Sequence, residues 1–142
     1  MDYYKISPDG LKNMLGMELY LGKIVSLDSK LKELVKIRVS QINGCAYCIT
    51  THSKEARNNG ETEQRIYGLN AWQECRFYSK KEQLALQLAE NITLISEKKV
   101  PDALYQEIRK EFNEKEYTDL VLLITQINSW NRISIAMGNI VG

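Results

Sequence analysis

The 142-residue chain has only one histidine and almost no net charge, with a formal value of +1. Its 19 basic residues nearly balance 18 acidic ones, which argues against nucleic acid or an anionic membrane surface as the main partner. No run of about 18 apolar residues occurs, so we expect no membrane-spanning helix. The polar start of the chain does not resemble a signal peptide, and we therefore expect a cytoplasmic protein.

Three cysteines and one histidine also restrict the metal and cofactor chemistry that the chain can support. In a reducing cytoplasm, so few cysteines are expected to be thiols rather than a disulfide framework. A structural zinc site needs four ligands, and Cys75 has no paired cysteine that would complete one. Haem attachment needs a histidine directly after the second cysteine of a Cys-x-x-Cys pair, where this chain has Ile49. We expect neither a metal nor a cofactor.

Strand-like alternation of apolar and polar residues is weak, and apolar residues recur at helical spacing almost throughout. The sequence therefore predicts an all-α fold, with residues 1–142 forming one domain, a helical bundle of about seven helices. The first expected helix follows Pro8 and is traced by Leu11, Met14, Leu15, Glu18 and Leu21; the second covers Leu31–Ile42 and ends near Gly44; the third runs from about Cys45 to Gly60. The fourth carries Ile66, Leu69 and Trp72. The fifth begins with a capping box of Ser79 and Glu82, the sixth has Pro101 in its first turn, and the seventh is long and begins with Asn113 and Glu116.

Chemically reactive side chains gather in the segment Gly44-Cys45-Ala46-Tyr47-Cys48-Ile49-Thr50-Thr51-His52. On a helix, these intervals bring Cys45, Cys48 and His52 to one face. Two cysteines at this spacing have Cα atoms about 5 Å apart, inside the range that a disulfide requires. A nucleophilic thiol, a resolving thiol and a proton carrier together indicate thiol redox chemistry. From the residues alone, a zinc site and two inert buried cysteines remain alternatives.

The sequence also indicates the local environment of Cys45, His52 and Glu33. Gly44 ends the preceding segment, so we expect Cys45 in the first turn of the next helix, where unpaired N–H groups favour a thiolate. His52 lies within hydrogen-bond or one-water reach of Cys48, which favours a role in proton transfer. Glu33 lies among apolar neighbours at the edge of a buried stripe, although most glutamates are solvated surface groups.

The spacing of Glu33, Cys45, Cys48 and His52 resembles the active-site motif of the alkylhydroperoxidase D-like proteins, part of the carboxymuconolactone decarboxylase superfamily. The similarity covers nearly the whole chain. It includes Ser40-Gln41-Ile42-Asn43-Gly44-Cys45-Ala46-Tyr47-Cys48, His52-Ser53-Lys54-Glu55-Ala56-Arg57, Gly60-Glu61-Thr62, Ala71-Trp72, the helix from Glu82 to Thr93, and Asn128-Ser129-Trp130-Asn131-Arg132.

The resemblance implies an all-α protein that assembles as a homotrimer or homohexamer and reduces hydroperoxides. By this match, Cys48 attacks the peroxide and becomes a sulfenic acid, and Cys45 resolves it to a disulfide. His52 and Glu33 form the proton relay. The best-known member of the family is reduced again by a lipoylated partner, so a lipoylated protein or another thiol is the expected electron donor.

One residue departs from the best-known type, which has a histidine where this chain has Tyr47. Tyrosine has an unperturbed pKa near ~10 and is a poor base at neutral pH, so the relay here depends on His52. The assignment of the first nucleophile also stays open, because the helix dipole favours Cys45 and the family motif favours Cys48. We expect Cys75 to be a spare thiol.

Two other functions compete with the peroxidase interpretation. One is a decarboxylase of the muconolactone type, although that branch does not rely on a Cys-x-x-Cys pair. The other is a non-enzymatic, oligomeric redox sensor whose disulfide state changes its assembly. The segment Trp130-Asn131-Arg132 is expected to pack in the core or at a subunit interface rather than take part in catalysis.

Overall fold

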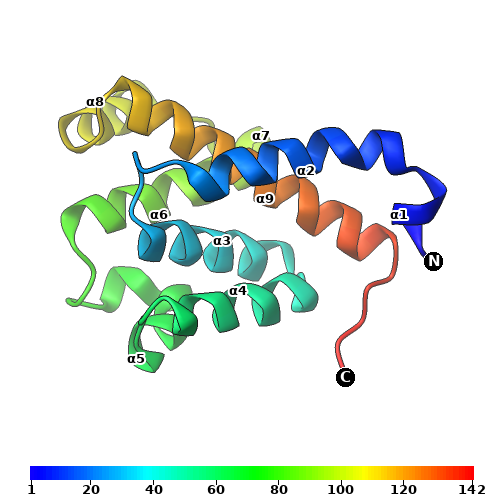
Figure 1. Cartoon of the computed structure of the whole chain (residues 1–142). Coiled ribbons are helices and arrows are strands. Elements are labelled where there is room, and N and C mark those ends of the chain that lie inside the picture. Colours follow the sequence, from blue (N-terminus) through cyan, green and yellow to red (C-terminus); the bar gives the residue numbers. More distant parts are fainter.

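The computed structural model describes all residues from 1 to 142, and the chain is helical with no strand (Figure 1). In chain order the elements are α1 (Tyr3–Ile6), α2 (Pro8–Lys23), α3 (Ser29–Asn43), α4 (Ala46–Asn58), α5 (Glu63–Tyr67), the 3₁₀ helix η1 (Leu69–Glu74), α6 (Lys80–Thr93), α7 (Ile95–Lys98), α8 (Asp102–Glu111) and α9 (Glu114–Ala136). The predicted all-α fold is confirmed. None of these helices combines the length and the apolar character needed to span a bilayer.

The count of about seven helices is too low, because the structure has ten helical segments. The expected fourth helix is divided into α5 and η1, and Ala71 inside η1 departs from helical dihedrals with φ −128° and ψ 33°. The two other additions, α1 and α7, have four residues each. A single turn is too short to show a helical repeat of apolar residues, so the sequence pattern could not reveal them.

Helix ends follow the local chemistry of the sequence closely. The capping boxes predicted from Ser79 with Glu82 and from Asn113 with Glu116 are both present, at the starts of α6 and α9. Pro101 lies one position earlier than predicted, because it occupies the N-cap of α8 with ψ 149° rather than the first turn. These caps satisfy backbone N–H groups that have no partner within their own helix.

Helix α3 holds the centre of the molecule and contacts α4, α6 and α9, while α2 lies along α9 (Figure 1). The side chains of Leu34, Val35 and Val39 on α3 have no exposed surface. The largest apolar cluster joins α3 to α6 and α9 and includes both Cys45 and Cys48. The reactive segment is therefore built into the core, where the packing of three helices fixes its position.

Candidate active site

Gly44 determines how the chain passes from α3 to the reactive segment. Its backbone has φ 71° and ψ 32°, a left-handed conformation that glycine adopts without steric cost, and α3 ends there as predicted. Cys45 then occupies the N-cap of α4 instead of the predicted first turn, since α4 begins at Ala46. Cys48 lies in the first turn. Both thiols are thus at the positive end of the α4 dipole.

The two sulfur atoms are close together and shielded from water. The Sγ atoms of Cys45 and Cys48 lie 2.8 Å apart, and Cys45 donates toward Cys48. Both cysteines are free thiols, with 1% and 5% of their surfaces exposed. A disulfide between them would need only a small approach of the sulfurs, because the bond is about 2.05 Å long.

A carboxylate from α3 reaches the imidazole on α4. His52 Nδ1 lies 2.9 Å from Glu33 Oε2, and both side chains are largely buried. The other carboxylate oxygen of Glu33 accepts a hydrogen bond from Lys36 Nζ at 3.4 Å. Spacing in the sequence could not establish this pairing, because it depends on how α3 and α4 pack against each other.

The charge of Glu33 sets the hydrogen-bonding state of the imidazole. Burial alone would raise the pKa of Glu33, but the hydrogen bond from His52 and the positive charge of Lys36 outweigh burial and lower it. Glu33 is therefore a carboxylate at neutral pH. It accepts the Nδ1–H of His52, which leaves Nε2 of the neutral ring unprotonated and able to act as a base.

The environment of Cys48 opposes its ionisation in the resting state. Burial, with a smaller contribution from the adjacent Cys45 thiol, raises the pKa of Cys48 to about 12. Asn131 and Ser134, both on α9, act in the opposite direction and lower the pKa of Cys48, because each is able to donate a hydrogen bond to the thiolate. The reduced protein therefore holds Cys48 as a thiol at neutral pH.

A pocket of about 220 Å³ opens onto Cys48 and His52. Its walls come from α1, α2, α4, α9 and the C-terminal tail, and they consist of Tyr3, Tyr4, Leu15, Glu18, Tyr47, Cys48, Thr51, His52, Trp130, Ser134 and Asn139. Cys45 does not line this pocket. Of the two thiols, Cys48 is the one that a small molecule in the pocket can meet.

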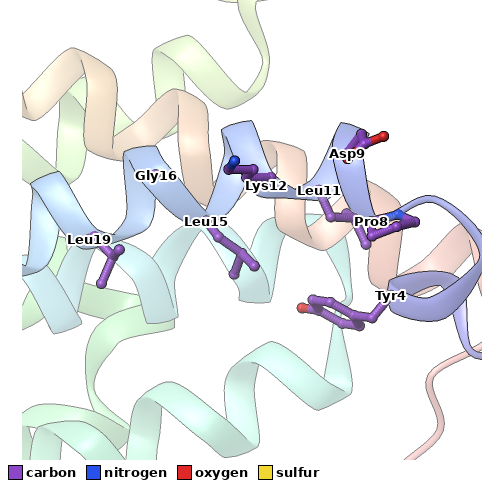
Figure 2. A pocket seen from close by; sticks show the side chains of 8 residues that line it. All are labelled: Tyr4, Pro8, Asp9, Leu11, Lys12, Leu15, Gly16 and Leu19. Atoms are coloured by element: carbon purple, nitrogen blue, oxygen red, sulfur yellow. The ribbon is translucent and has the colours of Figure 1, made fainter.

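A second, larger hollow runs along the outside of α2 and contains no thiol (Figure 2). Figure 2 shows Leu15 and Leu19 projecting to the same side of α2, with Leu15 directed toward the ring of Tyr4. Tyr4 and Leu15 also line the Cys48 pocket, so the two hollows share part of a wall.

Several pocket residues did not stand out in the sequence. Glu18 accepts hydrogen bonds from Trp130 Nε1 at 2.8 Å and Gln126 Nε2 at 3.2 Å, and it lies 3.8 Å from Lys36 Nζ. The one available signal was an acidic residue within the apolar stripe of α2. Ser134 had no signal, because a lone serine in a long helix usually has no special role.

The remaining candidates, Cys75 and Asn131, do not line the pocket. Cys75 is partly exposed, and its thiol donates to the Ala71 carbonyl at 3.5 Å, away from the pair. Asn131 is fully buried and joins α9 to α3 through Ser40 and Asn43. No group of three or more histidine, cysteine, aspartate or glutamate side chains is arranged to hold a metal ion.

Comparison with known proteins gives this geometry a family context. The uncharacterized protein YdfG of Bacillus subtilis (strain 168) is 59% identical over 139 residues, which cover 98% of this chain and 94% of YdfG. A protein of unknown function from Agrobacterium tumefaciens, ATU0492, is 32% identical with a TM-score of 0.95, and the match covers 100% of this chain and 97% of that one. Its structure bears the description of an antioxidant defence protein, AhpD.

A more distant structure has the same fold. An uncharacterized peroxidase-related protein from Silicibacter sp. TM1040 is 22% identical with a TM-score of 0.81, and the match covers 94% of this chain and 71% of that one. Residues 8–91, from α2 through most of α6, match the carboxymuconolactone decarboxylase family. The chain belongs to the carboxymuconolactone decarboxylase family and has an alkylhydroperoxidase D-like fold.

Proposed function

We propose that the protein is a thiol-dependent peroxidase that reduces hydroperoxides with the Cys45–Cys48 pair. The observation that carries this proposal is a pair of sulfurs 2.8 Å apart, one of which lines a pocket beside an imidazole held by a carboxylate. Family membership and the antioxidant description of ATU0492 support peroxidase-like activity in general. The roles of individual residues are those that the family resemblance implies; the geometry supports them, and they form part of the proposal.

In the first step, Nε2 of His52 takes the thiol proton of Cys48 while a hydroperoxide occupies the pocket. The Cys48 sulfur attacks one peroxide oxygen, the O–O bond breaks, and Cys48 becomes a sulfenic acid. The departing alkoxide or hydroxide takes the proton from His52 and leaves as an alcohol or water. Glu33 stabilises the imidazolium that exists between these two transfers, because its carboxylate accepts the Nδ1–H bond.

In the second step, Cys45 attacks the sulfenic sulfur of Cys48. A disulfide forms, and the sulfenic oxygen leaves as water with the proton of Cys45. An external dithiol then donates two electrons through a mixed disulfide and restores both thiols. We propose a lipoylated protein or another thiol as this donor.

Pocket access supports Cys48, rather than Cys45, as the first nucleophile. Cys48 lines the pocket with His52, whereas Cys45 is 1% exposed and lies behind it in the core. The dipole of α4 acts on both thiols and does not separate them. Tyr47 lies at the pocket with 49% of its surface exposed, where its phenol is able to donate a hydrogen bond to the substrate.

Steady-state reduction of several hydroperoxides, with dihydrolipoamide or dithiothreitol as donor, tests the proposal. We expect turnover by the wild type and by Cys75→Ser, and loss of turnover in Cys48→Ser and Cys45→Ser. Mass spectrometry of the wild type after one equivalent of peroxide should find a Cys45–Cys48 disulfide. Full activity of either pair variant, or untouched thiols after peroxide, would reject the assignment. Release of carbon dioxide from γ-carboxymuconolactone without thiol turnover would establish the decarboxylase alternative instead.

We also propose that the protein assembles as a homotrimer or homohexamer, as the family resemblance implies. The near-zero net charge leaves little electrostatic repulsion between copies. The apolar side chains on the outside of α2 offer a surface that a second copy could bury (Figure 2).

A further inference from the structure

The hydroxyl of Ser134 is a buried polar group without a hydrogen-bond partner. Ser134 lies in the last turns of α9, is 4% exposed, and lines the pocket together with Cys48 and His52. A buried hydroxyl without a partner costs free energy, since it loses its hydrogen bonds to water. The position therefore points to a partner that is not present in the resting thiol form.

Other helical hydroxyls in the chain behave differently. Ser40, Thr118 and Ser129 each donate to the carbonyl four residues earlier, at 2.7, 2.8 and 3.1 Å. This return to the helix backbone is the usual arrangement for such side chains. The Ser134 hydroxyl makes no such bond to its own helix, although Ser134 is one of the residues that line the pocket.

Asn131 lies one turn earlier on the same face of α9 and offers a second donor. Its Nδ2 donates one hydrogen to Ser40 Oγ at 3.0 Å, and its Oδ1 accepts from Asn43 Nδ2 at 3.0 Å. An amide nitrogen carries two hydrogens, so one remains available for Cys48. Both Asn131 and Ser134 lower the pKa of Cys48 against the opposing effect of burial. The side chains on α9 that lower the pKa of the reactive thiol are thus two neutral donors.

The titratable groups around Cys48 come from the other elements of the site. They are Cys45, Tyr47 and His52 on or beside α4, Tyr3 and Tyr4 on α1, and Glu18 on α2. Glu33 and Lys36 on α3 are also near, but another side chain lies between them and Cys48. None of the cationic groups in this set contacts the Cys48 sulfur. Beyond the imidazolium that His52 becomes and the N-terminus of α4, the stabilisation of a negative charge on that sulfur comes from neutral donors.

We infer that the Ser134 hydroxyl donates a hydrogen bond to the Cys48 sulfur once His52 has removed the thiol proton. The inference rests on the proposed function and adds a catalytic residue to it. A thiolate accepts hydrogen bonds far better than a thiol, so the contact strengthens as the charge develops. No bond to Ser134 forms or breaks, and its proton stays on Oγ throughout.

The test uses a Cys45→Ser, Cys75→Ser background, in which Cys48 is the only thiol. Ultraviolet titration of the thiolate gives the Cys48 pKa, and iodoacetamide alkylation gives its reactivity at neutral pH. We expect Ser134→Ala to raise the pKa by about one unit and to slow alkylation about tenfold, the size expected for one charge-assisted hydrogen bond. Ser134→Thr keeps the hydroxyl and should retain the pKa of the parent.

Ser129→Ala is the matched control, because Ser129 is on the same helix and its hydroxyl bonds to its own backbone. An unchanged pKa in Ser134→Ala overturns the inference. So does a shift of equal size in Ser134→Thr, since that result would reflect packing and not the hydrogen bond. These measurements need no peroxide. Failure of wild-type turnover would thus reject the proposed function without altering the pKa result, and the two failures remain distinguishable.

Discussion

At the scale of single residues, the site has to produce a nucleophile from a thiol that resists ionisation. Because burial raises the pKa of Cys48 to about 12, only a very small fraction of Cys48 side chains are thiolates at neutral pH. A population that small cannot support rapid attack by itself. The base that removes the proton, and the donors that stabilise the thiolate, therefore determine the rate. His52, Glu33 and Ser134 supply these functions in the proposal.

Glu33→Gln tests the carboxylate without changing its shape. A glutamine amide can donate to Nδ1 of His52, which favours the tautomer with a proton on Nε2 and removes the base. Loss of a general base typically costs about 10²–10⁴-fold, so we expect kcat/KM for hydroperoxide to fall by at least about 100-fold. Steady-state kinetics with a fixed thiol donor provide the measurement.

Glu55→Gln provides the control for this change, since Glu55 is exposed on α4, one turn after His52. Glu55→Gln should leave kcat/KM within experimental error of the wild type. Wild-type kinetics in Glu33→Gln would show that the ion pair positions α3 against α4 without taking part in proton transfer.

At the scale of helices, the sequence predicts where a helix begins or ends wherever the signal is local. The starts of α6 and α9 follow from capping boxes, and the end of α3 follows from Gly44. The contact between Glu33 and His52 was not readable from periodicity, because α3 and α4 must cross at one particular point to create it. Only the family motif suggested it. Ser134 approaches Cys48 from a helix far along the chain, so neither spacing nor motif could indicate its position.

A buried carboxylate ties α9 to α2 and to the loop that follows it. Asp119 has no exposed surface and accepts hydrogen bonds from Tyr20 at 2.6 Å and Ser26 at 2.5 Å. Burial alone would raise the pKa of Asp119, but hydrogen bonds from Lys115, Ser26 and Tyr20 outweigh burial and lower it. This network fixes α2, which supplies Leu15 and Glu18 to the active-site pocket.

Asp119→Asn should lower the free energy of unfolding by about 1–3 kcal/mol, because the amide nitrogen cannot accept the hydrogen bond that one carboxylate oxygen accepts from Tyr20 or Ser26. Since the folded pKa of Asp119 lies below its unfolded value, the carboxylate stabilises the protein above the unfolded pKa, and this contribution disappears as pH falls through the folded pKa. The stability gap between wild type and variant should therefore narrow in acid. Urea denaturation at neutral and acidic pH measures both effects.

Lys115→Ala gives the comparison for Asp119→Asn, because 62% of the Lys115 side chain is exposed and such pairs contribute at most about 1 kcal/mol. A neutral-pH loss as large as that of Asp119→Asn would mean that the surface ion pair, and not the buried network, holds α2 in place.

At the scale of the whole molecule, the proposed assembly and the proposed catalysis share the outer face of α2. Leu15 is 41% exposed, Leu19 is 64% exposed and Tyr4 is 46% exposed, although all three are large and apolar. Leu15 and Tyr4 belong both to this face and to the pocket that contains Cys48. A second copy that covered α2 would therefore also enclose one wall of the active site.

Leu19→Glu tests the proposed assembly. Burying a leucine contributes about 1.5–3 kcal/mol, and a buried glutamate adds an opposing desolvation cost, so each contact should lose at least a factor of about ten in its association constant. Sedimentation equilibrium should find the wild type as a trimer or hexamer and Leu19→Glu shifted toward the monomer. The Cys45–Cys48 pair lies in the core and should still form a disulfide in the dissociated chain.

Val25→Glu distinguishes the α2 face from the rest of the surface, because Val25 is 98% exposed and lies outside both hollows. It introduces the same charge and should leave the assembly intact. If Leu19→Glu stays assembled like Val25→Glu, the contact between copies lies elsewhere on the surface. If dissociation also raises KM for bulky hydroperoxides while kcat for the smallest one is retained, the shared wall of Leu15 and Tyr4 links assembly to substrate binding. A lower kcat with unchanged KM would show that assembly does not affect substrate binding.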